Sequence, residues 1–484
     1  MRICLLLIIF IILYIPARAQ TLDSVNYQEL QKKVEHASQM AINYLKTSQK
    51  QESDSPRYFK GEWGSIMEMN FWFPILGGYQ RAYDSNCFAV AGTYNILAQL
   101  YLEHPEYEEI PEMLNLAFPR IMAYESDGSF NFWNALPPTH KMRVIFEPDN
   151  PLVRRPNNFK LSLNFISKAA NVPNDNDDTA AGYMALYYHN KIFKSSIPDS
   201  LTQFGQMVTQ YRDLDRRNRH WYNVFRSHGY DIGAYLTWLA DEHEYLGNWN
   251  LLKDYIHAQL FYLPISKMYP HAYKPYIPYG TNDLDPIVNT NVLSAFELLN
   301  IENPKGFNDA LDFIEKCVAR EDYDFAATYY PNRYHMPYYI SKSWQLGVKE
   351  LERVKQPIVD FLLENQHENG SWSSRDLIND HDTLQSTIYA LNTYLHFDML
   401  DNERVRTSAF KALEYILSHK IKTLNGYYWK GGVFFAGGTV VRHILHWKSD
   451  AFTTALTLEA LLGMKGYLEE KDSLKHFSEA QLIE

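Results

Sequence analysis

The chain has few cysteines: Cys4, Cys87 and Cys317 are the only three among 484 residues. A framework of several disulfides is therefore excluded, while one bond between Cys87 and Cys317 is left open by the spacing. Clustered Lys and Arg are absent and the formal net charge is −11, so nucleic acid is not an expected partner. No Gly-rich phosphate loop, His-Glu-x-x-His pair, Gly-x-Ser-x-Gly elbow or dinucleotide fingerprint occurs. We expect no cofactor and no metal.

One long apolar run occurs, from Ile3 to Ile15, between Arg2 and the small-x-small sequence Ala17-Arg18-Ala19. A basic start, a short apolar core and a small-residue ending are typical of a signal peptide. The run is shorter than the roughly 20 residues of a membrane span, and no other run approaches that length. We expect residues 1–19 to be removed and the protein to be secreted or periplasmic. The alternative is an uncleaved anchor.

No Gly/Ser-rich or Pro-rich linker divides residues 20–484, which favours a single domain. Aromatic residues make up 15% of the chain, with 36 Tyr and 10 Trp. This is enough to line a cavity as well as to fill a core.

Two kinds of helical segment alternate along the chain with a period of roughly 50 residues. The first kind is rich in small residues and apolar on nearly every side, as buried helices are. It covers residues 84–100, 178–189, 231–245, 285–299, 382–397 and 450–462, with a weaker member at 337–351. The second kind is amphipathic and covers residues 26–47, 107–122, 198–213, 248–262, 305–319, 354–366 and 402–418. The alternation predicts an all-α toroid of six to seven helical hairpins, with an inner and an outer ring.

The links between these segments are unequal in length. Links from inner to outer segments are short, whereas those from outer to inner segments are long. The long links cover residues 48–83, 123–177, 214–230, 263–284, 320–336, 367–381 and 419–449. In a ring of antiparallel hairpins they all lie on the rim that carries the N-termini of the inner helices. Long loops commonly serve a site, so the functional site is expected on this rim.

An acidic sequence, Asp175-Asn176-Asp177-Asp178-Thr179-Ala180, begins the second buried segment. It resembles the Asp-x-Asp-Asp-Thr-Ala motif of squalene–hopene cyclases and related class II terpene cyclases. Gly370-Ser371-Trp372 resembles the core of the repeat found in those enzymes, and Gln366 lies close before it. The α/α-toroid of that family, which protein prenyltransferases share, is also what the helix pattern predicts.

The resemblance implies that Asp177 donates a proton to a carbon–carbon double bond of a neutral isoprenoid lipid, with Asp175 and Asp178 tuning its acidity. Crowded carboxyl groups cannot all ionise cheaply, so one of them keeps its proton. Aromatic faces would stabilise the resulting carbocation. Two other interpretations of the acidic sequence stay open: a turn with a helix N-cap, or a contact for an ion or a sugar.

Other functions suit the same architecture. Helical barrels also house secreted glycoside hydrolases and polysaccharide lyases, in which two carboxyl groups act across a cleft. A third interpretation is a toroid that binds a ligand or protein without catalysis. The rim residues that we expect to contact a lipid, glycan or other small-molecule substrate are Trp63, Trp72, Trp133, His228, Asp231, Tyr329, Tyr330, Trp372, His381, Asp382 and Trp429.

Overall fold

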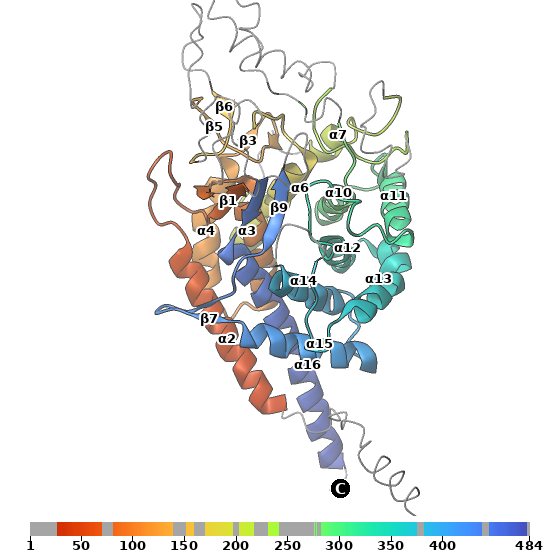
Figure 1. The fold of residues 1–484 in the computed structure, drawn as a ribbon. Coiled ribbons are helices and arrows are strands. Elements are labelled where there is room, and N and C mark those ends of the chain that lie inside the picture. The colour runs from red at the N-terminus through yellow and green to blue at the C-terminus, as the bar shows by residue number, and fades with distance from the viewer. Residues whose placement is uncertain are drawn as a thin grey trace, which may run out of the picture.

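The computed structural model describes residues 27–69, 81–138, 152–158, 170–196, 203–216, 231–241, 275, 277, 282–374, 382–437 and 445–481. Within these residues, six helices form a closed inner ring, in which each helix packs against the next and the last packs against the first (Figure 1). They are α3 (Cys87–Glu103), α6 (Asn176–Phe193), α10 (Pro286–Leu298), α12 (His335–Leu346), α14 (Thr383–His396) and α16 (Asp450–Gln481).

The inner helices bury polar as well as apolar residues. Thr93, Thr290 and Thr457 each donate a hydrogen bond to the carbonyl four residues earlier, at 2.7–2.8 Å. A hydroxyl that is satisfied within its own helix can be buried without an unpaired polar group. Small side chains of this kind allow six helices to approach one another around a common axis.

The outer helices are amphipathic and lie outside the ring. They are α2 (Tyr27–Ser48), α4 (Glu109–Met122), α7 (Phe204–Val208), α11 (Phe307–Ala319), α13 (Glu352–Asn365) and α15 (Glu403–Ser418), with a short 3₁₀ turn η6 (Lys349–Leu351) before α13. In α11 the buried residues include Leu311, Ile314 and Val318, which lie on one face at helical spacing. The outer neighbour of α16 is α2, so the first described helix packs against the last one (Figure 1).

One predicted inner helix is absent from the described residues. The described part of the 231–245 segment, residues 231–241, contains no helix, and Asp231 is exposed with a positive φ of 53°. The side chain of Asn289 bonds both the N–H and the carbonyl of Tyr235, at 2.9 Å each. Asn282 does the same for Trp238, at 2.8 and 2.6 Å. These apolar residues are thus buried as an extended strip whose backbone is paired with asparagine side chains.

The described inner ring therefore has six members, and the weak segment at 337–351 corresponds to a genuine member, α12. The predicted outer segment at 248–262 lies outside the described residues. The prediction of an α/α-toroid is confirmed, with six hairpins among the residues that the structure describes.

The long loops carry strands that the sequence did not predict. One antiparallel sheet has the order β2-β1-β10-β9 and joins loops from both ends of the chain. Its members are β2 (Arg81–Asp84), β1 (Ser65–Met69), β10 (Leu445–Lys448) and β9 (Val433–Gly437). Short pairs form between β3 (Glu125–Ser126) and β4 (Ser129–Phe130), β5 (Ala135–Leu136) and β6 (Val153–Arg154), and β7 (Ile421–Lys422) and β8 (Tyr427–Tyr428). Across the described residues, none of the helices combines the length and hydropathy needed to span a membrane.

Candidate active site

The acidic sequence forms the N-terminus of α6. Asp175 has extended backbone and accepts a hydrogen bond of 2.8 Å from the backbone N–H of Asp178, which makes it the N-cap. Asp177 lies in the first turn and is only 5% exposed. The side-chain amide of Asn291, in α10, donates to Oδ1 of Asp177 at 2.7 Å, and the hydroxyl of Tyr330 donates to Oδ2. Each carboxyl oxygen of Asp177 therefore has its own donor.

Burial controls the acidity of the three aspartates. It raises the pKa of Asp177 to about 6, while the donors Tyr330 and Asn291 act in the opposite direction. Burial, with repulsion from Asp177, raises the pKa of Asp175 to about 8. Burial and the neighbouring Asp175 raise the pKa of Asp178 well above its usual range. Asp177 is thus the strongest acid of the three, because it has the best donors.

Asp178 lies beside Cys87, the first residue of α3. Burial raises the pKa of the Cys87 thiol, and the nearby carboxyl of Asp178 raises it further. Cys87 and Cys317 are both buried and no disulfide joins them. The bond that the sequence left open is therefore not formed.

Aromatic rings surround the phenol that binds Asp177. The ring of Tyr330 lies 5.9 Å from Phe88, 5.5 Å from Tyr339 and 6.1 Å from Phe435, between centroids. The His335 ring lies 5.4 Å away, and burial lowers its pKa to about 3, so it is neutral. Ring faces at this spacing can stabilise a positive charge that develops beside Asp177.

A cavity, here called the inner cavity, lies within the ring beside Asn291 and measures about 70 Å³. Its wall combines aromatic and aliphatic side chains with the polar residues Asn95, Gln99, Asn291, Ser294 and Lys342. Residues that line it include Phe88, Ile96, Tyr188, Tyr338, Tyr339, Leu346 and Phe452. Asn291 connects this cavity to the carboxyl group of Asp177.

Three predicted substrate contacts belong instead to the scaffold. The indole N–H groups of Trp63, Trp372 and Trp429 donate to the carbonyls of Leu45, Leu362 and Ile416, at 2.8–2.9 Å. These carbonyls lie on the outer helices α2, α13 and α15, and all three indoles are fully buried. The tryptophans fill the space between outer helices and rim loops, so we correct their assignment to substrate binding.

The glutamine near the Gly-Ser-Trp sequence has a related role. Gln366 Nε2 donates to the carbonyls of Gly370 and Ser408, at 3.0 and 2.9 Å. Gln49 Nε2 bonds the carbonyls of Gly61 and Met113 in the same way, at 3.0 and 2.9 Å. Each glutamine ties a rim loop to the next outer helix, so the repeat fixes the loop and supplies no chemistry.

Two further predicted residues belong to an aromatic cluster on the rim. This cluster, here called the aromatic cap, consists of Phe132, Trp133, Tyr329, Phe435 and Trp447. The Tyr329 and Phe435 rings stack at 5.6 Å, and the Phe132 and Phe435 rings stack at 4.7 Å. The indoles of Trp133 and Trp447 both donate to Oδ2 of Asp84, at 3.1 and 2.8 Å. Phe435 connects the aromatic cap to Tyr330, and so to Asp177.

The remaining predicted residues lie elsewhere. Asp231 is exposed and begins none of the described helices. Asp382 is buried and accepts a hydrogen bond of 3.1 Å from the N–H of Val433, so it supports β9. Trp72, His228 and His381 lie outside the described residues.

Reasoning from the sequence missed Asn291 and Phe88. Asn291 is a buried amide in α10, and a buried amide needs a partner. That requirement was the available signal. Phe88 had no signal, because an aromatic residue in a buried helix is ordinarily part of the core.

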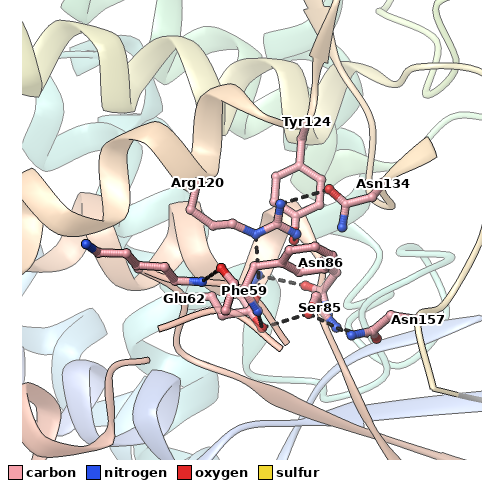
Figure 2. A network of polar contacts seen from close by, with 12 residues as sticks. Phe59, Glu62, Ser85, Asn86, Arg120, Tyr124, Asn134 and Asn157 are labelled. Atoms are coloured by element: carbon pink, nitrogen blue, oxygen red, sulfur yellow. Dashed lines mark hydrogen bonds and ion pairs between the residues drawn. The ribbon is translucent and has the colours of Figure 1, made fainter. Parts of the chain in front are cut away.

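A second buried charge cluster supports the rim near β1 and β2. Figure 2 shows Glu62 beside Arg120, with Nε and Oε2 3.1 Å apart and the side chains 0% and 5% exposed. Glu62 Oε1 also accepts from the hydroxyl of Ser85 at 2.7 Å. Arg120 donates to Asn134 at 2.9 Å and stacks on Phe59, 4.2 Å from its centroid. The charges are paired and hydrogen-bonded, so this cluster holds loops in place.

No family model and no curated protein matches the sequence. The fold is similar to that of the type II terpene cyclase MstE from Scytonema, with a TM-score of 0.51 and 12% identity over 90% of this chain and 99% of that chain. It is also similar to cellobiose 2-epimerase from Spirochaeta thermophila, with a TM-score of 0.50 and 13% identity over 93% of this chain and 100% of that chain. The enzyme of that name from Bacillus thermoamylovorans matches at a TM-score of 0.50 and 9% identity, over 91% and 99%. At such identities the likeness establishes a shared α/α-toroid fold.

Proposed function

We propose that this protein is a Brønsted-acid enzyme of the class II terpene-cyclase type, acting on a neutral isoprenoid lipid. One observation carries the proposal: Asp177 is buried beside a ring-lined cavity, with a separate donor on each carboxyl oxygen. A buried carboxyl group keeps its proton at a higher pH than an exposed one. Asp177 can therefore hold a proton away from water, next to apolar surface.

The two donors also stabilise the charge that the reaction leaves on Asp177. When the proton passes to an alkene carbon, the electron pair of the double bond forms the new C–H bond, and Asp177 becomes a carboxylate. The Asn291 amide and the Tyr330 hydroxyl then face the two oxygens of that carboxylate. Donors placed where charge develops stabilise the transition state, and these also make Asp177 a stronger acid.

The new carbocation needs an environment that neither quenches nor repels it. The rings of Phe88, Tyr339 and Phe435 lie around Tyr330, and the pKa of buried His335 is too low for it to carry a repelling charge. Lys342, the cationic side chain among the described lining residues of the inner cavity, is paired with Glu459. The cation can add to a further double bond of the substrate and finally lose a proton to water, and the Asp177 carboxylate regains a proton from water before the next turnover. The product is then a cyclic isomer of the substrate.

The inner cavity, at about 70 Å³, is smaller than a polyprenyl chain. Substrate entry therefore requires ring-bearing side chains to part, and the aromatic cap lies next to Tyr330 through Phe435. We expect substrate to bind slowly and to protect the rim loops from proteolysis.

Two of the similar structures bear on the choice of substrate. The MstE cyclase is described in complex with geranylgeranyl dihydroxybenzoate as its substrate, whereas cellobiose 2-epimerases are named for a sugar. A sugar would require polar groups on most sides, while the larger part of the inner-cavity lining is aromatic or aliphatic and its polar residues are Asn95, Gln99, Asn291, Ser294 and Lys342. This favours the lipid over glycan chemistry.

The test is incubation of the purified protein with geranylgeraniol, squalene and, separately, cellobiose, followed by mass spectrometry and chromatography of the products. We expect a cyclic isomer from a polyprenyl substrate and no change in cellobiose. Asp177→Asn should abolish the reaction while its circular dichroism and melting temperature stay near those of the wild type. Turnover by Asp177→Asn would disprove the proposed acid, and turnover of cellobiose alone would favour a sugar enzyme.

Export is a separate part of the proposal. It rests on Arg2, the apolar run Ile3–Ile15 and Ala17-Arg18-Ala19. Intact-mass analysis of the protein recovered from its native cells should give an N-terminus at Gln20. A mass that includes Met1 would argue for the anchor instead.

A further inference from the structure

A second cavity, here called the distal cavity, lies at the opposite end of the ring from Asp177. It measures about 260 Å³ and is lined by residues at the C-terminal ends of α3 and α14 and by the middle of α16. Along α3, the 15 residues from Phe88 to Glu103 correspond to roughly 22 Å of helix. The distal cavity therefore lies far along α3 from the end that holds Asp177, although it adjoins the inner cavity at Gln99, which lines both.

A buried ionic group divides the two cavities. Tyr338 and Lys342 line the inner cavity, and Glu459 and His396 line the distal one. The Tyr338 hydroxyl donates to Oε2 of Glu459 at 2.9 Å, Lys342 binds Oε1, and Nε2 of His396 lies 3.2 Å from Oε1. Although burial opposes it, Lys342 and His396 lower the pKa of Glu459 to about 2. Glu459 thus remains charged and already paired.

The distal cavity is lined by negative groups. The exposed Glu103, Asp398 and Glu470 and the buried Glu459 line it, together with His104 and His396, and no Lys or Arg is among its described lining residues. Lys342 pairs with Glu459, and Lys471 lies 3.7 Å from Glu470, but Glu103 and Asp398 form no ion pair within the described part of the chain. The α3 and α14 helices also end here, and a helix C-terminus carries a partial negative charge.

Two buried oxygens at this cavity have no donor among the residues that the structure describes. Gln99 and Asn392 line the distal cavity and are 8% and 0% exposed. Gln99 Oε1 and Asn392 Oδ1 accept no hydrogen bond from the described residues. The Asn392 amide nitrogen donates to the Leu456 carbonyl, and the Gln99 amide nitrogen donates to Glu103 and Gln345. Exchanging the oxygen and nitrogen of either amide would therefore break existing hydrogen bonds. Both oxygens require a hydrogen-bond donor, as the nearby carboxylates do.

Two exposed glycines border the cavity on the α16 side. Gly463 and Gly466 lie three residues apart, on one face of the helix, and both line the cavity. A Cβ added at Gly466 would meet no atom within 4 Å. A Cβ added at Gly463 would lie 3.0 Å from a methyl group of Leu395, so close packing accounts for Gly463 but not for Gly466.

From this arrangement we infer that the distal cavity binds an organic cation with at least one primary ammonium group, of the size of a short diamine. The lining supplies acceptors and negative charge and lacks opposing cations among its described residues. A metal ion fits less well, because among the residues described no three His, Cys, Asp or Glu side chains gather closely enough to hold one. The inference does not depend on the proposed reaction at Asp177.

The test is isothermal titration of the full chain with 1,5-diaminopentane, and with 1,5-pentanediol as a neutral ligand of the same length. We expect the diamine to bind and the diol not to bind. Gly466→Leu, which fills the cavity and favours the helix, should weaken diamine binding by at least about tenfold. Glu103→Gln, which removes one unpaired charge, should weaken it less. Gly466→Ala, which adds only a methyl group, serves as the control for helix propensity and should bind more tightly than Gly466→Leu.

Three results would overturn the inference. The first is no diamine binding to the wild type, and the second is equal binding of the diol. The third is diamine binding that Gly466→Leu leaves unchanged, since that would locate the ammonium group on the outer acidic surface. Melting curves of both Gly466 variants check that each is folded before it is titrated.

Discussion

The side-chain amide of Asn291 lies 2.7 Å from Oδ1 of Asp177 and joins α10 to α6 across the inner ring. Replacing Asn291 with Leu removes this donor at nearly constant volume. Asp177 should become a weaker acid, and the rate of alkene protonation should fall by about 10²-fold or more. Steady-state kinetics with the polyprenyl substrate measure the effect. Glu297→Gln, at an exposed position of the same helix and outside the cavity lining, is the matched control and should keep near-wild-type kcat.

The pH dependence of the reaction should follow Asp177. Its pKa is raised to about 6 by burial, and only the protonated form can donate. The rate should therefore fall as pH rises through about 6. The Tyr330 hydroxyl donates to Oδ2 and favours the charged form of Asp177. Tyr330→Phe removes this donor, so the alkaline limb of the pH–rate profile should shift to higher pH while kcat decreases. A limb that does not move in Tyr330→Phe would mean that another group controls it.

Stability should also depend on pH, because several buried aspartates hold protons in the folded state. Burial raises the pKa of Asp84 to about 6, that of Asp285 to about 7 and that of Asp175 to about 8. A raised folded-state pKa gives stability that is complete below about pH 4 and is lost as pH rises toward 8. The melting temperature should be higher at pH 5 than at pH 8.

Asp285→Asn tests how much one buried aspartate contributes to this dependence of melting temperature on pH. Asparagine can still cap α10, so the helix start is retained. The difference in melting temperature between pH 5 and pH 8 should become smaller than in the wild type. Asp215→Asn, at an exposed position, should leave it unchanged. An equal change in both variants would contradict the assignment to burial.

The Glu62–Arg120 pair should matter far more than an ion pair on the surface. Arg120→Met leaves the Glu62 carboxylate buried without its cation, at a cost of about 3–5 kcal/mol. Lys46→Met breaks an exposed pair with Glu112, although its N–O distance of 2.7 Å is shorter than the 3.1 Å between Arg120 and Glu62. This change should cost less than about 1 kcal/mol. Urea denaturation of the two variants compares them directly. Similar losses in both would show that burial is not the deciding factor.

Helical periodicity correctly predicted the toroid, and loop length is the basis for expecting the site on one rim. Periodicity failed at residues 231–241, because a buried apolar strip bonded to Asn282 and Asn289 has the same composition as a buried helix. The strands escaped prediction for a related reason. β9 and β10 are short, and β10 pairs with β1, a segment far away in the sequence, which local pattern does not reveal.

At the site, sequence motifs located Asp177 and the neighbouring aspartates, and the aromatic stretch from Tyr329 included its partner Tyr330. The motif could not distinguish aromatic residues that pack against the outer helices from those that lie near Tyr330 and Asp177. Trp372 and Phe435 are both aromatic residues of rim loops, yet one indole bonds an outer-helix carbonyl while the other ring reaches Tyr330. That distinction depends on the direction of each side chain in the folded structure, which local sequence does not specify.

The packing of α16 against both α2 and α3 has a consequence for how the molecule is made. Unlike an open solenoid, which can lengthen or shorten by a unit and be sealed by special end units, a closed ring has no spare position. The apolar face of α2, which is synthesised first, stays exposed to solvent until α16, which is synthesised last, packs against it. A chain that is truncated just before Asp450 would lack α16, so the apolar faces of α14 and α3 would both be exposed. We expect such a product to aggregate and not to form a smaller folded ring.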